Sequence, residues 1–233
     1  MVLKIGNGRL AWIVIGLSNS GKTYLVKQVL RKELIPRFIV KDKQGDSQCN
    51  IFIMSPSLSL SGDFKEFEDV LPDHHTEHRK QRLFDCYDEG VIQELFGAQK
   101  ALIKKHGKES APEVMIILDD CIDYLHNSKV INALFTRGRH YKISVCLITQ
   151  KFKSLNRTIR VNAALQTFFR CSNSSEIEQF CEEAVGRRYK DEFYQASEEL
   201  FKKPYTFIHV DYNEEDFKRR FGLGDNCNII GYF

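Results

Sequence analysis

A short glycine-bearing segment, Gly16-Leu-Ser-Asn-Ser-Gly-Lys-Thr23, has the G-x-x-x-x-G-K-T pattern of a phosphate-binding loop. Besides its two glycines, Gly16 and Gly21, the loop contains Ser18, Asn19, Ser20, Lys22 and Thr23. The glycines let the backbone curl so that successive N–H groups point into one concavity. Lys22 can then reach the β- and γ-phosphates, and the hydroxyl of Thr23 can ligate Mg²⁺. We therefore expect this chain to bind a nucleoside triphosphate together with Mg²⁺.

Two consecutive carboxylates, Asp119 and Asp120, follow the apolar run Val114–Leu118. Such a run predicts a central strand, and in open α/β sheets the carboxyl end of a central strand lies near the phosphates. We assign Asp119 to Mg²⁺, usually through water because the ion keeps several of its waters. Asp120 is placed to polarise the attacking water as a general base.

A third polar position, Gln150, ends the next apolar run, Ile143–Ile148. A polar residue there can sense the γ-phosphate, and a glutamine can also orient the water. The alternative is a polar residue that merely ends a strand. The segment that follows carries Lys151, Lys153, Arg157 and Arg160, which either face DNA phosphates or form a solvated surface.

The elements that position these residues alternate between apolar runs and helical stretches, which predicts an α/β fold with a mostly parallel sheet. We expect strands at 10–15, 50–54, 114–118, 143–148, 167–170 and 205–210. We expect helices from Thr23 to near Pro36 and over 89–105, 128–137, 176–184 and 190–201. Residues 61–82 look polar and irregular. The tail at 213–233 is polar and glycine-bearing, so we assign no element to it and leave partial order open. Residues 1–212 are expected to form one domain.

Composition supports an ordinary soluble globular protein, with 233 residues, 42% hydrophobic and 28% charged. A net charge of +3 is too small to indicate polyanion binding by itself. The seven cysteines include no C-x-x-C pair, which favours reduced thiols inside a cell. No apolar run approaches the roughly 20 residues that span a bilayer, so no membrane contact is expected. His74, His75 and His78 either bind a metal or lie in a solvated loop, and their charged neighbours favour the loop.

Four segments together resemble the DNA-packaging ATPases of large DNA viruses. They are Gly16–Thr23, Ile116-Ile-Leu-Asp-Asp120, Thr136-Arg-Gly-Arg-His-Tyr-Lys-Ile-Ser144 and Ile148-Thr-Gln150. The resemblance covers about residues 10–170. It points to the poxvirus-type branch, shared with virophages, of the FtsK–HerA group of P-loop motors.

The resemblance implies a RecA-like P-loop fold, with helices on both faces of the sheet and an extra strand between the P-loop strand and the Asp119 strand. It also implies ATP as the nucleotide and a ring of subunits around double-stranded DNA. That DNA would be held without regard to sequence and moved into a preformed capsid, with a capsid vertex protein as a candidate partner. The expected location is intracellular, in host cytoplasm or at a viral assembly site. Whether the protein is also associated with the virion is left open.

In that group an arginine reaches the γ-phosphate of the neighbouring subunit and stabilises transition-state charge. Arg139 matches the position before the sensor strand, and Arg160, Arg157 and Arg137 are the reserves. Each of them is equally compatible with a solvated surface charge. The chain shows no second acidic-cluster domain, so it resembles a motor without a fused nuclease.

Three other functions compete with this interpretation. A small P-loop kinase would use the stretch 137–142 as an arginine-rich lid, would act as a monomer on a small acceptor, and would ignore DNA. A GTPase is disfavoured because no Asn-Lys-x-Asp or Thr-Lys-x-Asp motif is present. A scaffold with a degenerate P-loop is disfavoured by the intact Lys22, Thr23, Asp119 and Asp120.

Overall fold

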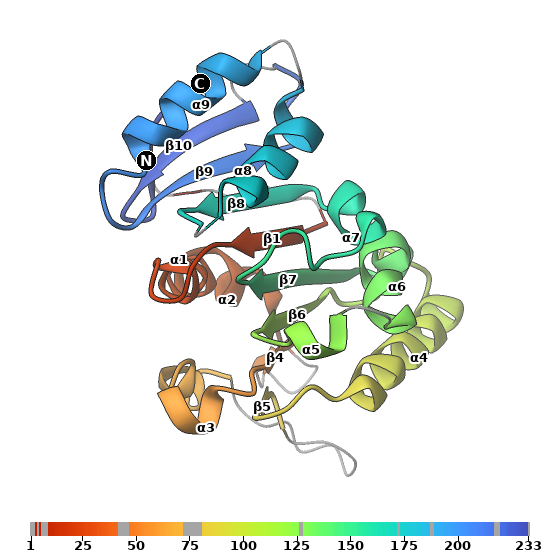
Figure 1. The fold of residues 1–233 in the computed structure, drawn as a ribbon. Coiled ribbons are helices and arrows are strands. Elements are labelled where there is room, and N and C mark those ends of the chain that lie inside the picture. The colour runs from red at the N-terminus through yellow and green to blue at the C-terminus, as the bar shows by residue number, and fades with distance from the viewer. Residues whose placement is uncertain are drawn as a thin grey trace.

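The computed structural model describes residues 3, 5, 9–41, 47–71, 81–125, 128–171, 173–186, 189–216 and 220–232. Within them, a nine-stranded sheet of order β11-β10-β9-β8-β1-β7-β6-β4-β5 forms the centre (Figure 1). Its strands are β1 Ala11–Ile15, β4 Ile51–Met54, β5 Leu83–Phe84, β6 Val114–Asp119, β7 Ile143–Thr149, β8 Leu165–Phe169, β9 Thr206–Asp211, β10 Phe221–Asp225 and β11 Asn228–Tyr232. A separate antiparallel pair joins β2 Ile39–Lys41 to β3 Ser47–Cys49.

The strands from β8 through β1, β7, β6 and β4 to β5 run parallel, and β9, β10 and β11 extend one edge of the sheet in antiparallel fashion. Every residue of β1, β6 and β7 is buried, as expected for strands covered on both faces. β7 lies between β1 and β6, which confirms the predicted extra strand.

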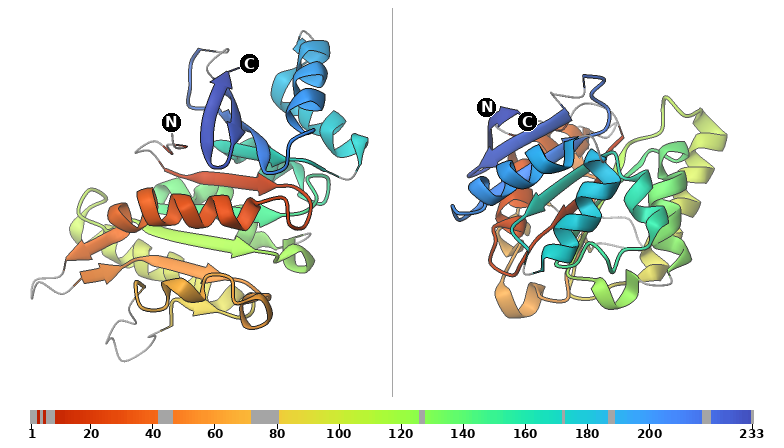
Figure 2. Two further views of the ribbon diagram at one scale, coloured as in Figure 1. Left: turned by 90° about the vertical axis from the view of Figure 1, so that its left-hand side faces the viewer. Right: turned by 45° about the horizontal axis from the view of Figure 1, so that its top comes forward.

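Helices cover both faces of the sheet (Figure 2). One layer contains α1 Lys22–Val29, the π-helical turn η1 Leu30–Leu34, α2 Ile35–Phe38, α3 Leu58–Ser61 and η2 Lys65–Phe67. The other contains α4 Glu89–His106, α6 Lys129–Arg137, α7 Arg157–Asn162, α8 Ser174–Phe180, η4 Cys181–Val185 and α9 Lys190–Leu200. The short elements α5 Ile122–Leu125 and η3 Gly138–His140 flank β6 and β7. The mostly parallel α/β architecture with helices on both faces is therefore confirmed.

Side-chain alternation along β1 shows how one strand serves both cores. Ala11, Ile13 and Ile15 belong to the core beneath α4, α6 and α8, whereas Trp12 and Val14 belong to the core beneath α1. Successive side chains of a strand point to opposite faces, so a strand buried on both sides must be apolar throughout. This is why the chain reads as a continuous apolar run immediately before the P-loop.

The helices differ in whether a side chain caps their first turn. The side chains of Asp88, Ser128, Asn156 and Asn173 cap α4, α6, α7 and α8 by accepting backbone N–H groups. By contrast, α1 begins after Gly21 with no side-chain cap, as α9 does after Tyr189. The first N–H groups of α1 are therefore available to a ligand.

The fold departs from the expectations in three places. The first helix ends at Phe38, near Pro36 as expected, but it is not one regular α-helix, because the π-helical turn η1 separates α1 from α2. Residues 61–71 are not simply polar and irregular, because Phe64, Phe67 and Leu71 are buried against the sheet. The tail, for which the sequence predicts no element, supplies β10 and β11, which complete the antiparallel edge.

Candidate nucleotide-binding site

The P-loop lies at the carboxyl ends of β7 and β8. The backbone N–H of Gly16 donates to the carbonyl of Thr149 (3.3 Å), and that of Leu17 donates to the carbonyl of Arg170 (3.0 Å). A Cβ atom on Gly16 would lie 2.5 Å from the Cβ of Phe169, closer than real atoms approach. Glycine is therefore required at this position by the neighbouring strand as well as by the turn.

The second glycine of the loop, Gly21, has φ +101°, in the region that favours glycine. Asn19 also has a positive φ, of 60°, which asparagine tolerates better than most residues. These two conformations turn the chain from β1 into α1 within a few residues. The uncapped amino end of α1 then faces the concavity of the loop.

Lys22 is almost fully buried, with 8% of its surface exposed. Its Nζ donates to the carbonyl of Leu17 at 2.6 Å, so the side chain folds back across the loop. Burial lowers the pKa of Lys22, while the carboxylates of Asp119 and Asp120 act in the opposite direction. A cation in this position is held ready for the phosphate oxygens of a nucleotide.

Asp119 ends β6 and is 5% exposed. Burial, followed by the nearby carboxylates of Asp120 and Asp63, raises its pKa to about 7. The hydroxyl of Thr23 lies 3.5 Å from Asp119 Oδ2. A buried carboxylate beside a hydroxyl, with more negative than positive neighbours, is a donor set that suits Mg²⁺. The residues present therefore fit the ion that the loop motif implies.

A hollow of about 250 Å³ joins these groups. It is lined by Ser18, Asn19, Lys22, Thr23, Ser57, Ser61, Asp63, Asp119, Asp120, Ile148, Thr149 and Gln150. Asp120 and Gln150 are exposed there, and Asp120 adopts φ 54°, which is uncommon for a residue other than glycine. The structure thus brings Lys22, Thr23 and Asp119 together with Asp120 and Gln150. We call this space the carboxylate hollow.

The segment after β4, which includes α3, adds residues that sequence reasoning missed. Ser57, Ser61 and Asp63 line the carboxylate hollow, and Asp63 lies 4.0 Å from Lys27 of α1. The only local signal is the Ser-Pro end of the preceding strand. Because β4 pairs with β6, the segment after β4 necessarily lies beside the Asp119 end of β6.

The four candidate arginines lie apart from the P-loop and differ from one another. Arg139 is exposed in η3, which precedes β7, so it lies at the opposite end of β7 from Gln150. Arg157 is exposed at the start of α7. Arg160 is engaged within the chain, where it forms two 2.8 Å hydrogen bonds to Glu183.

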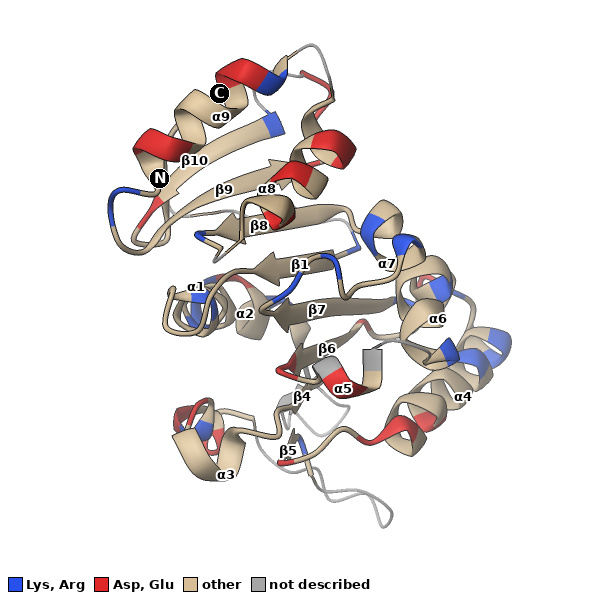
Figure 3. Ribbon diagram, in the orientation of Figure 1, with Lys and Arg blue, Asp and Glu red and all other residues tan. Residues whose placement is uncertain are grey.

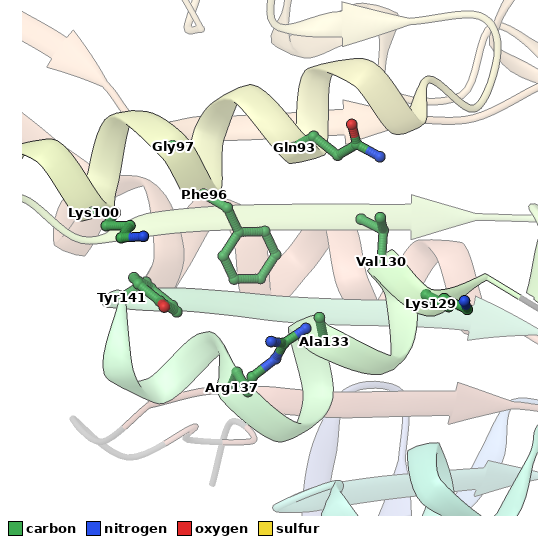
Figure 4. Close-up of a pocket in the computed structure, with 9 residues that line it drawn as sticks. All are labelled: Gln93, Phe96, Gly97, Lys100, Lys129, Val130, Ala133, Arg137 and Tyr141. Carbon is green, nitrogen blue, oxygen red and sulfur yellow. The ribbon is translucent and has the colours of Figure 1, made fainter.

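Arg137 lines a different hollow, of about 300 Å³, between α4 and α6 (Figure 4). Lys100 and Lys129 share this hollow, and the rings of Phe96 and Tyr141 meet there edge to face at 5.4 Å. No carboxylate is found among the described residues that line it. Despite its larger volume, this hollow lacks the groups that would hold a metal-bound triphosphate.

The remaining expectations concern metals, thiols and membranes. His74, His75 and His78 lie outside the described residues, and the part of the chain that is described contains no cluster of three or more His, Cys, Asp or Glu suited to a metal. All seven cysteines are free thiols. Within the described ranges, no helix combines the length and apolar character needed to cross a bilayer.

The chain is similar in sequence to proteins of large DNA viruses. A family model described as "Poxvirus A32 protein" matches residues 4–191. Uncharacterized protein 075L of Invertebrate iridescent virus 6 is 26% identical over 208 residues, covering 88% of this chain and 71% of that protein.

Two solved structures of genome-packaging enzymes share the fold. The genome packaging NTPase B204 of Sulfolobus turreted icosahedral virus 2, in complex with AMPPCP, superposes with a TM-score of 0.58 at 18% identity over 95% of this chain and 99% of that one. B204 of Sulfolobus Turreted Icosahedral Virus, described as a DNA-packaging ATPase, gives a TM-score of 0.60 at 18% identity over 92% and 96%.

Proposed function

The chain belongs to the poxvirus A32 protein family, and on that premise we propose that it is an ATPase that moves double-stranded DNA into a viral capsid, working as a ring of subunits. The observation that carries this proposal is the carboxylate hollow, where Lys22, Thr23 and Asp119 face one space. The similar fold of B204, a genome packaging NTPase solved in complex with AMPPCP, supports ATP as the nucleotide. We place the activity at a viral assembly site.

Each residue of the hollow has a proposed part in hydrolysis. The backbone N–H groups of the loop and Lys22 bind the β- and γ-phosphates. Thr23 and Asp119 hold Mg²⁺, which when bound neutralises phosphate charge. Asp120 polarises the attacking water, and Gln150 orients it near the γ-phosphate. Asp120 is exposed to solvent whereas Asp119 is buried, which supports this division of roles.

The position of Arg139 supports a ring. β7 contains seven residues between Arg139 and Gln150, so at about 3.3 Å per residue it separates the two ends by about 23 Å. Arg139 is therefore too far from its own nucleotide site to complete it. In a head-to-tail ring, each subunit presents one face to a different face of its neighbour. Arg139 would then act on the neighbouring γ-phosphate.

The basic segment after β7 supports contact with DNA. Lys151, Lys153 and Arg157 are exposed, and Figure 3 shows positive residues along this loop and on α7, whereas α8 and α9 are mainly acidic. Arg160 is left out of this surface because Glu183 binds it. Exposed lysines and arginines bind phosphates without reading bases, so affinity should fall steeply with added salt.

The test is ATP hydrolysis per subunit as a function of protein concentration, with and without long duplex DNA. We expect turnover per subunit to rise with protein concentration and again with DNA, and Lys22→Ala to abolish it. Arg139→Ala should retain nucleotide binding and lose assembly-dependent turnover by about 10³-fold, the scale of an arginine acting in trans. Lys105→Ala, which removes an exposed cation of α4 that has no part in the proposed site or DNA surface, is the matched control for Arg139.

Two outcomes would contradict the proposal. Turnover that is independent of protein concentration and of DNA, and that needs a small acceptor, would indicate the kinase. Full assembly-dependent activity in Arg139→Ala would show that another arginine, or none, acts between subunits.

A further inference from the structure

A second hollow adjoins the P-loop on the side away from the aspartates. It has a volume of about 300 Å³ and is lined by loop residues 17–20, by Arg170 after β8, and by residues 202–206, which lead into β9. It shares Ser18 and Asn19 with the carboxylate hollow. The two hollows therefore meet along the P-loop, and one bound molecule can contact both.

The charge of this second hollow is opposite to that of the first. Arg170, Lys202 and Lys203 line it, and no carboxylate is among its described lining residues; Lys202 is paired with Glu199, so Arg170 and Lys203 supply most of the positive charge. The carboxylate hollow has Asp63, Asp119 and Asp120 instead. A metal-bound terminal phosphate suits the carboxylate side, so the rest of the same molecule is directed toward the basic side.

The wall of the second hollow holds an aromatic ring against the P-loop backbone. A Cβ atom on Gly21 would lie 3.2 Å from Cδ1 of Tyr205, so the ring edge packs directly on the second glycine of the loop. Yet Tyr205 is 54% exposed. A large apolar ring that is exposed beside a phosphate cradle offers a flat face to a ligand.

The backbone of Tyr205 is held in an unfavourable conformation. Its φ of 61° lies in the left-handed region, which a bulky residue rarely adopts. The next residue, Thr206, fixes the turn, because its hydroxyl lies 2.8 Å from the carbonyl of Leu200 and 2.9 Å from that of Lys203 and donates its one hydrogen to this pair. Strain of this kind persists where surrounding contacts impose it, and it clusters at ligand sites.

We propose that Tyr205 is the stacking platform for the base of the nucleoside triphosphate, with Arg170 and Lys203 at the rim of the base site. This inference rests on the proposed function of the same P-loop. It assigns recognition of the base to the antiparallel edge of the sheet, whereas the phosphates are bound by the parallel part. Stacking is tolerant of base identity, so Tyr205 provides affinity for nucleosides in general.

The experiment compares two ligands, ATP and inorganic tripolyphosphate, each with Mg²⁺, by isothermal titration calorimetry. Tyr205→Asn removes the ring, and asparagine accepts the left-handed backbone. We expect Tyr205→Asn to weaken ATP binding about tenfold or more and to leave tripolyphosphate binding unchanged, because tripolyphosphate has no base. Tyr205→Phe restores ATP affinity because it keeps the ring. Tyr232→Asn, which replaces a tyrosine that is 53% exposed on β11, is the matched control.

Unchanged ATP affinity in Tyr205→Asn would overturn the base site, and so would an equal loss for both ligands, which would indicate a distorted loop. Weakened binding of duplex DNA with unchanged ATP affinity would also overturn it and would make the second hollow a DNA contact. The proposed function fails separately: Lys22→Ala must lose both ligands, and the wild type must show DNA-stimulated hydrolysis whatever the Tyr205 variants do.

Discussion

Replacement of Asp119 by asparagine should stabilise the ligand-free protein at the same time as it removes the metal site. Asp119 is 5% exposed, and burial together with Asp120 raises its pKa to about 7. The folded chain therefore disfavours the ionised carboxylate. Asparagine has nearly the same shape and can still accept from Thr23, but it carries no charge.

The size and sign of the effect follow from the pKa. An acid whose folded pKa is raised binds more protons when folded than when unfolded between the two values, so stability falls as pH rises through that window. For Asp119 the window runs from 3.8 to about 7. At about 1.36 kcal/mol for each pKa unit, the ionised form costs the folded state up to about 4 kcal/mol at pH 8.

The assay is urea unfolding of wild type and Asp119→Asn in EDTA, from pH 4 to pH 8. We expect similar stability near pH 4 and a variant more stable by about 2–4 kcal/mol at pH 8. With Mg²⁺ and ATP added, only the wild type should gain stability. An Asp119→Asn protein that is less stable than wild type at pH 8 in EDTA would refute the reasoning.

Three further predictions concern the framework of the site. Gly16→Ala should cost about 1–3 kcal/mol and abolish ATP binding, because the new Cβ would lie 2.5 Å from Phe169. Burial lowers the pKa of His209 to about 4, so the folded protein holds this imidazole neutral. Its contribution of about 3 kcal/mol to the free energy of unfolding is therefore complete above pH 6.5 and is lost as pH falls toward 4. Arg160→Ala should cost about 2 kcal/mol in unfolding free energy through loss of its two hydrogen bonds to Glu183.

Each of these has a matched control. Gly97 lies within α4, where a new Cβ meets nothing within 4 Å, so Gly97→Ala should raise stability by up to about 1 kcal/mol. As pH falls, protonation of Asp119 raises the free energy of unfolding and protonation of His209 lowers it, over overlapping pH ranges. The His209 contribution must therefore be measured as the difference in unfolding free energy between wild type and His209→Gln. A difference that does not change between pH 7 and 4 would contradict it. Arg157→Ala should leave the melting temperature unchanged, and an equal loss in both arginine variants would contradict the role given to Arg160.

Much of the sheet and the heart of the site could be predicted because their signals are local. Continuous apolar runs mark β1, β6 and β7, and the chemical residues follow each run directly. Parallel topology then places the carboxyl ends of those strands at one edge. The meeting of the P-loop with Asp119 and Gln150 therefore follows from the order of residues along the chain.

The rest depends on contacts between distant segments. Asp63 reaches the carboxylate hollow only because β4 pairs with β6, and nothing near it in the chain indicates that pairing. The strands β10 and β11 contain glycines and polar residues, a composition typical of a tail, and they form by extending the edge at β9. In the sequence Tyr205 looks like the start of a strand, and its packing on Gly21 is visible only in three dimensions.

The most direct test of the central claim is a structure of the protein with Mg²⁺ and a non-hydrolysable ATP analogue. We expect the β- and γ-phosphates within hydrogen-bonding distance of Lys22 Nζ, and the ion between the Thr23 hydroxyl and the Asp119 carboxylate. A nucleotide bound elsewhere, with no phosphate at the P-loop, would contradict the account. The hollow between α4 and α6 that Arg137 lines is one such place.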